Sequence, residues 1–202
     1  MKRVDWTDIQ VGDFYLTAVP SVEHDLIWQA ELALHPDAPT DFAATHAGIY
    51  GPVPGWVTEA WLDLTPPGID SVASVVADSK YTAAAAAEQV EVWRPDALNE
   101  HIYLAFSIYL NRYVPQKYGT WNLFGFLWMA EVKRLTGKDV QNPVECSQVC
   151  SQADADMLGI LVTCGANEPW IKTVNVANCD PLKFRMLNLA NQTTTTFKGV
   201  VK

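Results

Sequence analysis

Apolar residues in the first half of the chain fall in short runs that are bounded by proline, glycine and acidic residues. Such runs between turn residues are typical of β-strands. They lie at residues 9–17, 45–50, 55–64, 72–76 and 90–93. Because Gly51-Pro52-Val53-Pro54 separates the second run from the third, these two runs predict a β-hairpin.

Helical spacing begins at residues 21–34, where apolar side chains recur at intervals of three and four and Ser21 is placed to cap the helix. Further segments are apolar and aromatic enough for buried helices, and Gly137 suits the position that follows one of them. The threonine-rich last dozen residues predict a loosely held tail. The remaining expected elements are helices at 99–114, 120–135 and 143–158, a short helical turn at 180–187, and strands at 160–163 and 171–176.

These elements predict one α+β domain over residues 1–202, with its core at about 9–187 and a flexible C-terminal tail. Antiparallel strands come from the first half of the chain, and helices from the second half pack on them. A chain of 202 residues is long enough to bury a substantial core, and neither an internal repeat nor a long linker divides it.

Composition narrows the classes of function. Apolar residues make up 49% of the chain and charged residues 18%, as in globular proteins. The net charge of −9 and the lack of a basic stripe argue against nucleic-acid binding and against docking on anionic membranes. No signal-peptide pattern follows Met1, and no apolar stretch is long enough for stable membrane insertion. We therefore expect a soluble, cytoplasmic protein.

Four cysteines, at positions 146, 150, 164 and 179, predict free thiols because no signal peptide directs the chain to an oxidising compartment. Only the first two are spaced like zinc ligands, so we expect no metal and no cofactor. Most of these thiols should be buried as small hydrophobic side chains. Cys146 differs because it follows Pro143 at a predicted helix start, where the helix dipole favours a thiolate. Cys150 would lie one turn deeper, in a packing role.

His46 and Glu59 lie in the two strands of the predicted hairpin, each among apolar neighbours. A core histidine with satisfied hydrogen bonds is the simplest explanation of His46 alone. A loop of residues 51–54 would pair Tyr50 with Gly55 and set His46 directly opposite Glu59, whereas a loop one residue longer would put them on opposite faces. His24 and His35 are expected to be solvated, and His101 to start a helix.

Seven short motifs share an order along the chain. Together they resemble the circularly permuted NlpC/P60 group of papain-like cysteine hydrolases, typified by the YiiX and YaeF proteins. The mark of the permutation is a histidine that precedes the cysteine. The motifs are Val11-Gly12-Asp13-Phe14, His46-Ala47-Gly48-Ile49, Val57-Thr58-Glu59-Ala60, Val90-Glu91-Val92-Trp93-Arg94-Pro95, Tyr118-Gly119-Thr120-Trp121, Cys146-Ser147-Gln148-Val149 and Cys179-Asp180-Pro181-Leu182.

The resemblance implies a permuted papain-like fold with Cys146 as nucleophile, His46 as acid and base, and Glu59 as the group that orients the imidazole. Tyr118 and Ser147 are weaker candidates for substrate or oxyanion contacts. The implied activity is cleavage of an amide, peptide or acyl bond through a covalent thioacyl intermediate, with small peptide substrates that include peptidoglycan peptides. The alternative is a non-enzymatic binding or structural module that retains the fold, such as a component carried in a phage particle.

Overall fold

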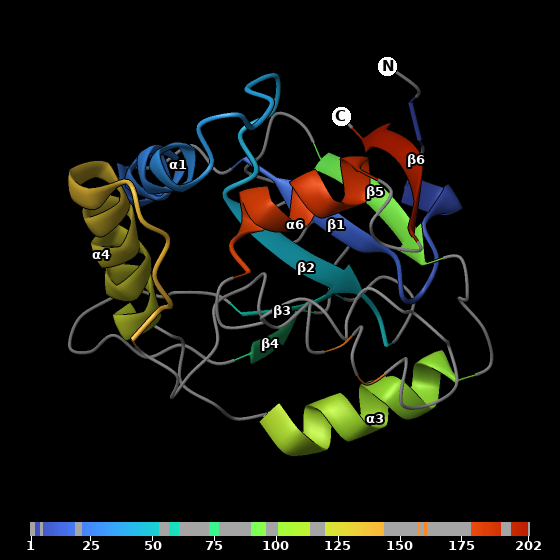
Figure 1. Cartoon of the computed structure of the whole chain (residues 1–202). Coiled ribbons are helices and arrows are strands. Elements are labelled where there is room, and N and C mark those ends of the chain that lie inside the picture. Colours follow the sequence, from blue (N-terminus) through green and yellow to red (C-terminus); the bar gives the residue numbers. More distant parts are fainter. Residues whose placement is uncertain are drawn as a thin grey trace.

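The computed structural model describes residues 3–4, 6–18, 22–52, 57–60, 73–76, 90–95, 101–113, 120–143, 157, 160, 179–190 and 195–201. Over these residues the chain is a mixed α+β structure (Figure 1). A 3-10 turn, η1, covers Trp6–Asp8. The strands are β1 (Phe14–Thr17), β2 (His46–Tyr50), β3 (Val57–Ala60), β4 (Ala73–Val76), β5 (Val90–Pro95) and β6 (Thr195–Val201). The helices are α1 (Val22–Leu34), α3 (Ile102–Tyr113), α4 (Thr120–Thr136) and α6 (Pro181–Leu189).

The strands form one antiparallel sheet in the order β4-β3-β2-β1-β5-β6. β1 lies inside the sheet, where it pairs with β2 on one side and with β5 on the other. All four of its side chains are buried. Since neighbouring side chains of a strand point to opposite faces, both faces of the sheet are covered at β1.

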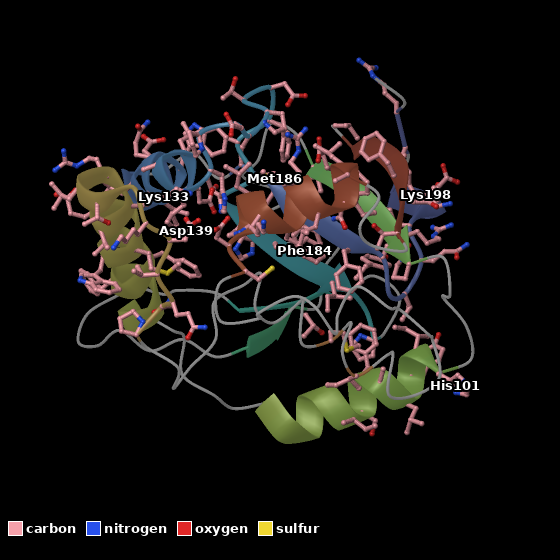
Figure 2. All side chains as sticks on the ribbon, in the orientation of Figure 1. His101, Lys133, Asp139, Phe184, Met186 and Lys198 are labelled. Carbon is pink, nitrogen blue, oxygen red and sulfur yellow. The ribbon has the colours of Figure 1, made fainter. Side chains whose placement is uncertain are left out.

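Helix α6 covers one of these faces and crosses β1, β2 and β5 (Figure 1). It begins at Asp180, whose carboxylate accepts a hydrogen bond from the backbone N–H of Lys183 at 2.7 Å, and Pro181 follows in the first turn. Both residues are typical of a helix start. Phe184 lies between the helix and the sheet, with its ring centre 5.9 Å from that of Phe14, while Met186 lies on the other side of the helix (Figure 2).

A buried ion pair joins α6 to the centre of the sheet. The Arg185 guanidinium donates to both carboxylate oxygens of Glu91 in β5, at 2.9 and 2.8 Å, and both side chains are 2% exposed. It also donates to Asp41 at 3.0 Å and lies over the ring of Phe42. Burial lowers the pKa of Arg185, but the hydrogen bonds to the two carboxylates outweigh it and raise that pKa overall.

Helices α1 and α4 pack side by side, to the left of the sheet in Figure 1. Their shared core consists of Ala30, Leu34, Phe126, Met129 and Ala130. Alanines at two of these positions bring the helix backbones close, and the larger side chains fill the remaining space.

A lysine at the end of α4 ties the two helices together. Lys133 donates to the backbone oxygen of Leu34 at 2.6 Å and pairs with Asp139 at 2.8 Å (Figure 2). It thereby satisfies one of the carbonyl groups that the end of α1 leaves without a helical partner. Gly137 has a φ of +69° and donates its N–H to Lys133, as expected of the residue that follows a helix.

Most of the expected elements are confirmed where the structure describes the chain, including the strands at 14–17, 46–50, 73–76 and 90–95 and the helices α1, α3 and α4. The short helical turn expected at 180–187 is a full helix, α6. Ile160, expected to begin a strand, is helical instead. The strand at 171–176 and most of the helix at 143–158 lie outside the described residues.

The C-terminal tail was predicted wrongly. Thr195–Val201 form the edge strand β6, which pairs with β5 from Pro95↔Thr195 to Val90↔Val201 across one irregularity. Phe197 packs on Trp93 with ring centres 4.9 Å apart, and Val200 is 3% exposed. Threonine and valine have high β-propensity, and the neighbouring strand supplies the pairing that a threonine-rich segment lacks alone.

Among the described residues, no helix combines the length and apolar character that a bilayer crossing requires.

Native-state hydrogen exchange tests the assignment of β6. We expect the β6 amides that donate to β5 to exchange slowly, because strand pairing must open before they meet water. Exchange within seconds at all of residues 195–201 would show that this segment is a loose tail. The amides of β5 that point to β1 provide an internal reference in the same experiment.

Two carboxylates on one arginine should differ strongly in their effect on stability. We expect Glu91→Gln to lower the free energy of unfolding by about 3 kcal/mol, because it leaves a buried guanidinium partly unpaired. Asp41 is 60% exposed, so Asp41→Asn should cost less than about 1 kcal/mol. Urea denaturation measures both values, and equal costs would contradict the assignment.

The stability that Asp41 contributes should also depend on pH. The hydrogen bond from Arg185 lowers the pKa of Asp41, so the stability due to Asp41 is present above its unfolded pKa. It is lost as the pH falls through the lowered pKa. The difference between the wild type and Asp41→Asn should therefore close on acidification.

Candidate functional site

The face of the sheet opposite α6 carries His46. We call it the histidine face and define it by Tyr15 and Thr17 of β1, His46 and Gly48 of β2, and Val92 of β5. These residues share a face because Thr17 pairs with His46 and Tyr15 pairs with both Gly48 and Val92. All five of these residues are buried.

His46 begins β2 and is 2% exposed. The backbone N–H of the preceding residue, Thr45, donates to Thr17 at 3.1 Å, which sets the start of the strand. The Tyr15 ring stands beside the imidazole, with ring centres 6.3 Å apart and planes inclined by 50°. The imidazole therefore lies in the interior, beside an aromatic ring of the neighbouring strand.

The hairpin register differs from the predicted one. Tyr50 pairs with Val57, not with Gly55, and Ile49 pairs with Thr58. Residues 51–56 therefore lie between the paired positions, two more than the predicted loop of 51–54. The longer loop has a specific contact, because the buried Thr58 hydroxyl donates to the backbone oxygen of Gly51 at 2.9 Å.

A shift of two residues preserves the face of every side chain. Continued one step along both strands, the observed register places Glu59 opposite Gly48, with His46 one diagonal step away. Positions in this diagonal relation are about 7–8 Å apart, within reach of long side chains. The backbone positions of His46 and Glu59 thus share one face, which is one of the two arrangements that the sequence left open, but they are not directly opposite.

The other predicted site residues, Cys146, Tyr118 and Ser147, lie outside the described residues, as do Cys150 and Cys164. The described range 120–143 ends at Pro143, three residues before Cys146. The preceding residue, Asn142, is 2% exposed and its side chain lies against Gly125 of α4, where a β-carbon would collide with it. The segment that leads to Cys146 is thus anchored on α4 through a glycine that makes room for an amide.

A second polar group was missed at the sequence level. His35, expected to be solvated, has a side chain only 17% exposed and lies 2.7 Å from the carboxylate of Asp180. This carboxylate also caps α6, and Cys179 beside it is fully buried. The Asp180-Pro181 pair signals a helix start in the sequence, but no local pattern links it to a histidine 145 residues away.

The described residues contain no group of three or more His, Cys, Asp or Glu side chains that could hold a metal ion. His101 precedes α3 and accepts the N–H of Ala105, in agreement with the prediction that it starts a helix.

The chain matches no protein-family model, and it matches no curated protein.

Asp180 should contribute to stability through two partners. We expect Asp180→Ala to lower the free energy of unfolding by about 1–2 kcal/mol, because the start of α6 loses its cap and His35 loses its partner. The exposed Asp37 is a matched control, and Asp37→Ala should change stability by less than about 0.5 kcal/mol. Chemical denaturation compares the two variants, and equal effects would contradict the capping role.

Proposed function

We propose that this protein is a cysteine hydrolase or amidase with a permuted papain-like fold. It would cleave an amide, peptide or acyl bond through a covalent thioacyl intermediate. The observation that carries the proposal is that His46, buried to 2% exposure, shares a sheet face with the position of Glu59. A buried imidazole beside a carboxylate position is the usual arrangement of a general base and the group that orients it.

Cys146 is the proposed nucleophile. Its thiolate attacks the carbonyl carbon of the substrate, and a carbon–sulfur bond forms as the carbonyl oxygen becomes an oxyanion. The backbone N–H of Cys146, at the helix start that the sequence predicts, would be a natural donor to this oxyanion. Tyr118 and Ser147 are the candidates for further polar contacts with the substrate.

His46 moves the proton in both halves of the reaction. It takes the thiol proton to form the ion pair and then gives it to the leaving amine or alcohol as the bond to the carbonyl carbon breaks. In the second half it takes a proton from water, whose oxygen attacks the thioester. The acid is then released and the thiolate returns. Glu59 would stabilise the imidazolium and keep the ring in one orientation.

Burial on the histidine face supports this assignment of roles. Ionised groups interact more strongly where water is excluded, so an imidazole 2% exposed responds more to a nearby carboxylate than an exposed one would. The same burial would be costly for an imidazolium without a partner. The proposed substrates are those that the resemblance implies, the amide and acyl groups of small peptides, peptidoglycan peptides and acyl compounds.

Alkylation with iodoacetamide across pH tests the proposal. We expect Cys146 to react with a thiol pKa well below the ordinary value of about 8.5, because imidazolium and helix dipole both stabilise the thiolate. His46→Ala should raise this pKa toward the ordinary value. Peptide mass spectrometry locates the label among the four cysteines.

The controls come from the other thiols. Cys150→Ala should leave the pH profile unchanged, and Cys179, which is fully buried, should label only after unfolding. Slow labelling with an ordinary pKa, confined to Cys150, would contradict the hydrolase proposal. The same result would favour a binding module with no nucleophile.

A further inference from the structure

Tyr15 and His46 are diagonal neighbours on the histidine face. In the register of β1 with β2, Thr17 lies opposite His46, and Tyr15 lies opposite Gly48, two residues further along. Diagonal positions on paired strands are about 7–8 Å apart, a distance that large aromatic side chains can bridge. Two residues of β1 therefore flank His46, and both are buried, Thr17 fully and Tyr15 to 4% exposure.

The Tyr15 ring occupies the space that Gly48 leaves open. A β-carbon on Gly48 would lie 2.7 Å from Cε1 and 2.5 Å from Cζ of the Tyr15 ring, and closest of all to its hydroxyl oxygen. Real β-carbons essentially never approach so closely, so only glycine permits this arrangement. The ring thus stands on β2 where the side chain of residue 48 would otherwise be, on the same face as His46.

This placement brings an aromatic ring against the imidazole. The two ring centres are 6.3 Å apart and the ring planes are inclined by 50°. Aromatic pairs favour such inclined arrangements, at separations of about 4.5–7 Å. The torsion that turns an imidazole about its bond to the β-carbon has a broad minimum, so covalent geometry does not fix the plane of the ring. Packing must fix it, and the Tyr15 ring lies where it can do so.

Proton transfer by His46 depends on the orientation of its ring. A general base must present a ring nitrogen within hydrogen-bond distance of the proton that it takes, so an imidazole that turns freely loses efficiency. Burial alone does not select one orientation, because a histidine ring can be turned over in nearly the same space with its nitrogen and carbon atoms exchanged. A neighbouring group that holds the ring is therefore part of what the chemistry requires.

We propose that Tyr15 is a positioning residue for His46, whose ring, seated over Gly48, holds the imidazole in one orientation for proton transfer. This inference rests on the proposed function and names a further group in the same site. The task belongs to the ring of Tyr15 and not to its hydroxyl group. Gly48 contributes by admitting the ring.

Two variants of Tyr15 separate the ring from the hydroxyl group. Tyr15→Phe keeps the ring, and Tyr15→Leu replaces it with a smaller apolar side chain. We expect Cys146 of Tyr15→Phe to react with iodoacetamide at neutral pH within about twofold of the wild-type rate, and that of Tyr15→Leu to react about tenfold more slowly. Tyr103→Leu, which removes an exposed ring of α3, is the matched control and should leave the rate unchanged.

NMR of the imidazole nitrogens reads the effect on His46 itself. A proton–nitrogen correlation spectrum reports the tautomer and charge of each histidine, and His46→Gln identifies the His46 signals among the four histidines. We expect one set of His46 signals in the wild type and in Tyr15→Phe. Tyr15→Leu should broaden or shift them, because the imidazole can then turn. A slower Cys146 in Tyr15→Leu with an unaltered imidazole would show a merely structural effect and contradict the inference.

Gly48→Ala displaces the ring while Tyr15 itself stays unchanged. The added methyl group would collide with the ring, so Cys146 should react slowly and the His46 signals should change as in Tyr15→Leu. Adding Gly48→Ala to Tyr15→Leu should cause little further loss, because the ring that the methyl group displaces is already gone.

Circular dichroism checks that each variant is folded. If neither Tyr15→Leu nor Gly48→Ala folds, the wild type decides through the nuclear Overhauser effect between the Tyr15 ring and the His46 imidazole, which the ring contact predicts. A wild-type rate in Tyr15→Leu, equal losses in Tyr15→Phe and Tyr15→Leu, or the lack of that Overhauser effect would overturn the inference.

The two proposals fail in different ways. A His46 imidazole that depends on the Tyr15 ring, in a protein whose Cys146 shows an ordinary thiol pKa, would support the positioning contact and overturn the hydrolase. A wild-type Cys146 with a lowered thiol pKa, in a protein where neither Cys146 nor the imidazole responds to Tyr15→Leu, would support the hydrolase and overturn the role of Tyr15.

Discussion

β1 hydrogen-bonds to a strand on each side, so each of its side chains must enter one of two buried layers. Phe14 and Leu16 enter the layer under α6, and Tyr15 and Thr17 enter the histidine face. Burial of each large apolar side chain contributes about 1.5–3 kcal/mol, so a four-residue strand anchors both layers. The registers of β2 and β5 against β1 then determine which residues meet in each layer.

The α6 layer joins parts of the chain that are far apart in sequence. Arg185 and Glu91 are 94 residues apart, and His35 and Asp180 are 145 apart. Buried ion pairs add little net stability compared with apolar packing, but an unpaired buried charge is costly. Such pairs therefore discriminate against wrong arrangements, and here they specify where α6 lies on the sheet. We infer that this layer has a structural role, while the proposed chemistry belongs to the histidine face.

The candidate site shows which features of a hairpin can be predicted from the sequence of its strands. The sequence indicated a hairpin but left its loop length, and so the faces of His46 and Glu59, open; the structure places both positions on one face. The predicted loop was two residues too short, because no pattern in the sequence indicates the hydrogen bond from the Thr58 hydroxyl to the backbone oxygen of Gly51. An error of two keeps the face, whereas an error of one would have reversed it. Cys146 was selected from its helix-start pattern and from a resemblance, and its role stays a prediction.

Local patterns in the sequence determined the type of most elements: the strands at β1, β2 and β5, the four helices, the Asp180-Pro181 helix start and the glycine after α4. These follow from side-chain periodicity and backbone preference, which act over a few residues. Only the tertiary structure decided that the threonine-rich end is a strand, that His35 meets Asp180, and that Tyr15 lies across Gly48. Each of these depends on a partner supplied by a distant segment, and no local pattern carries the position of that partner.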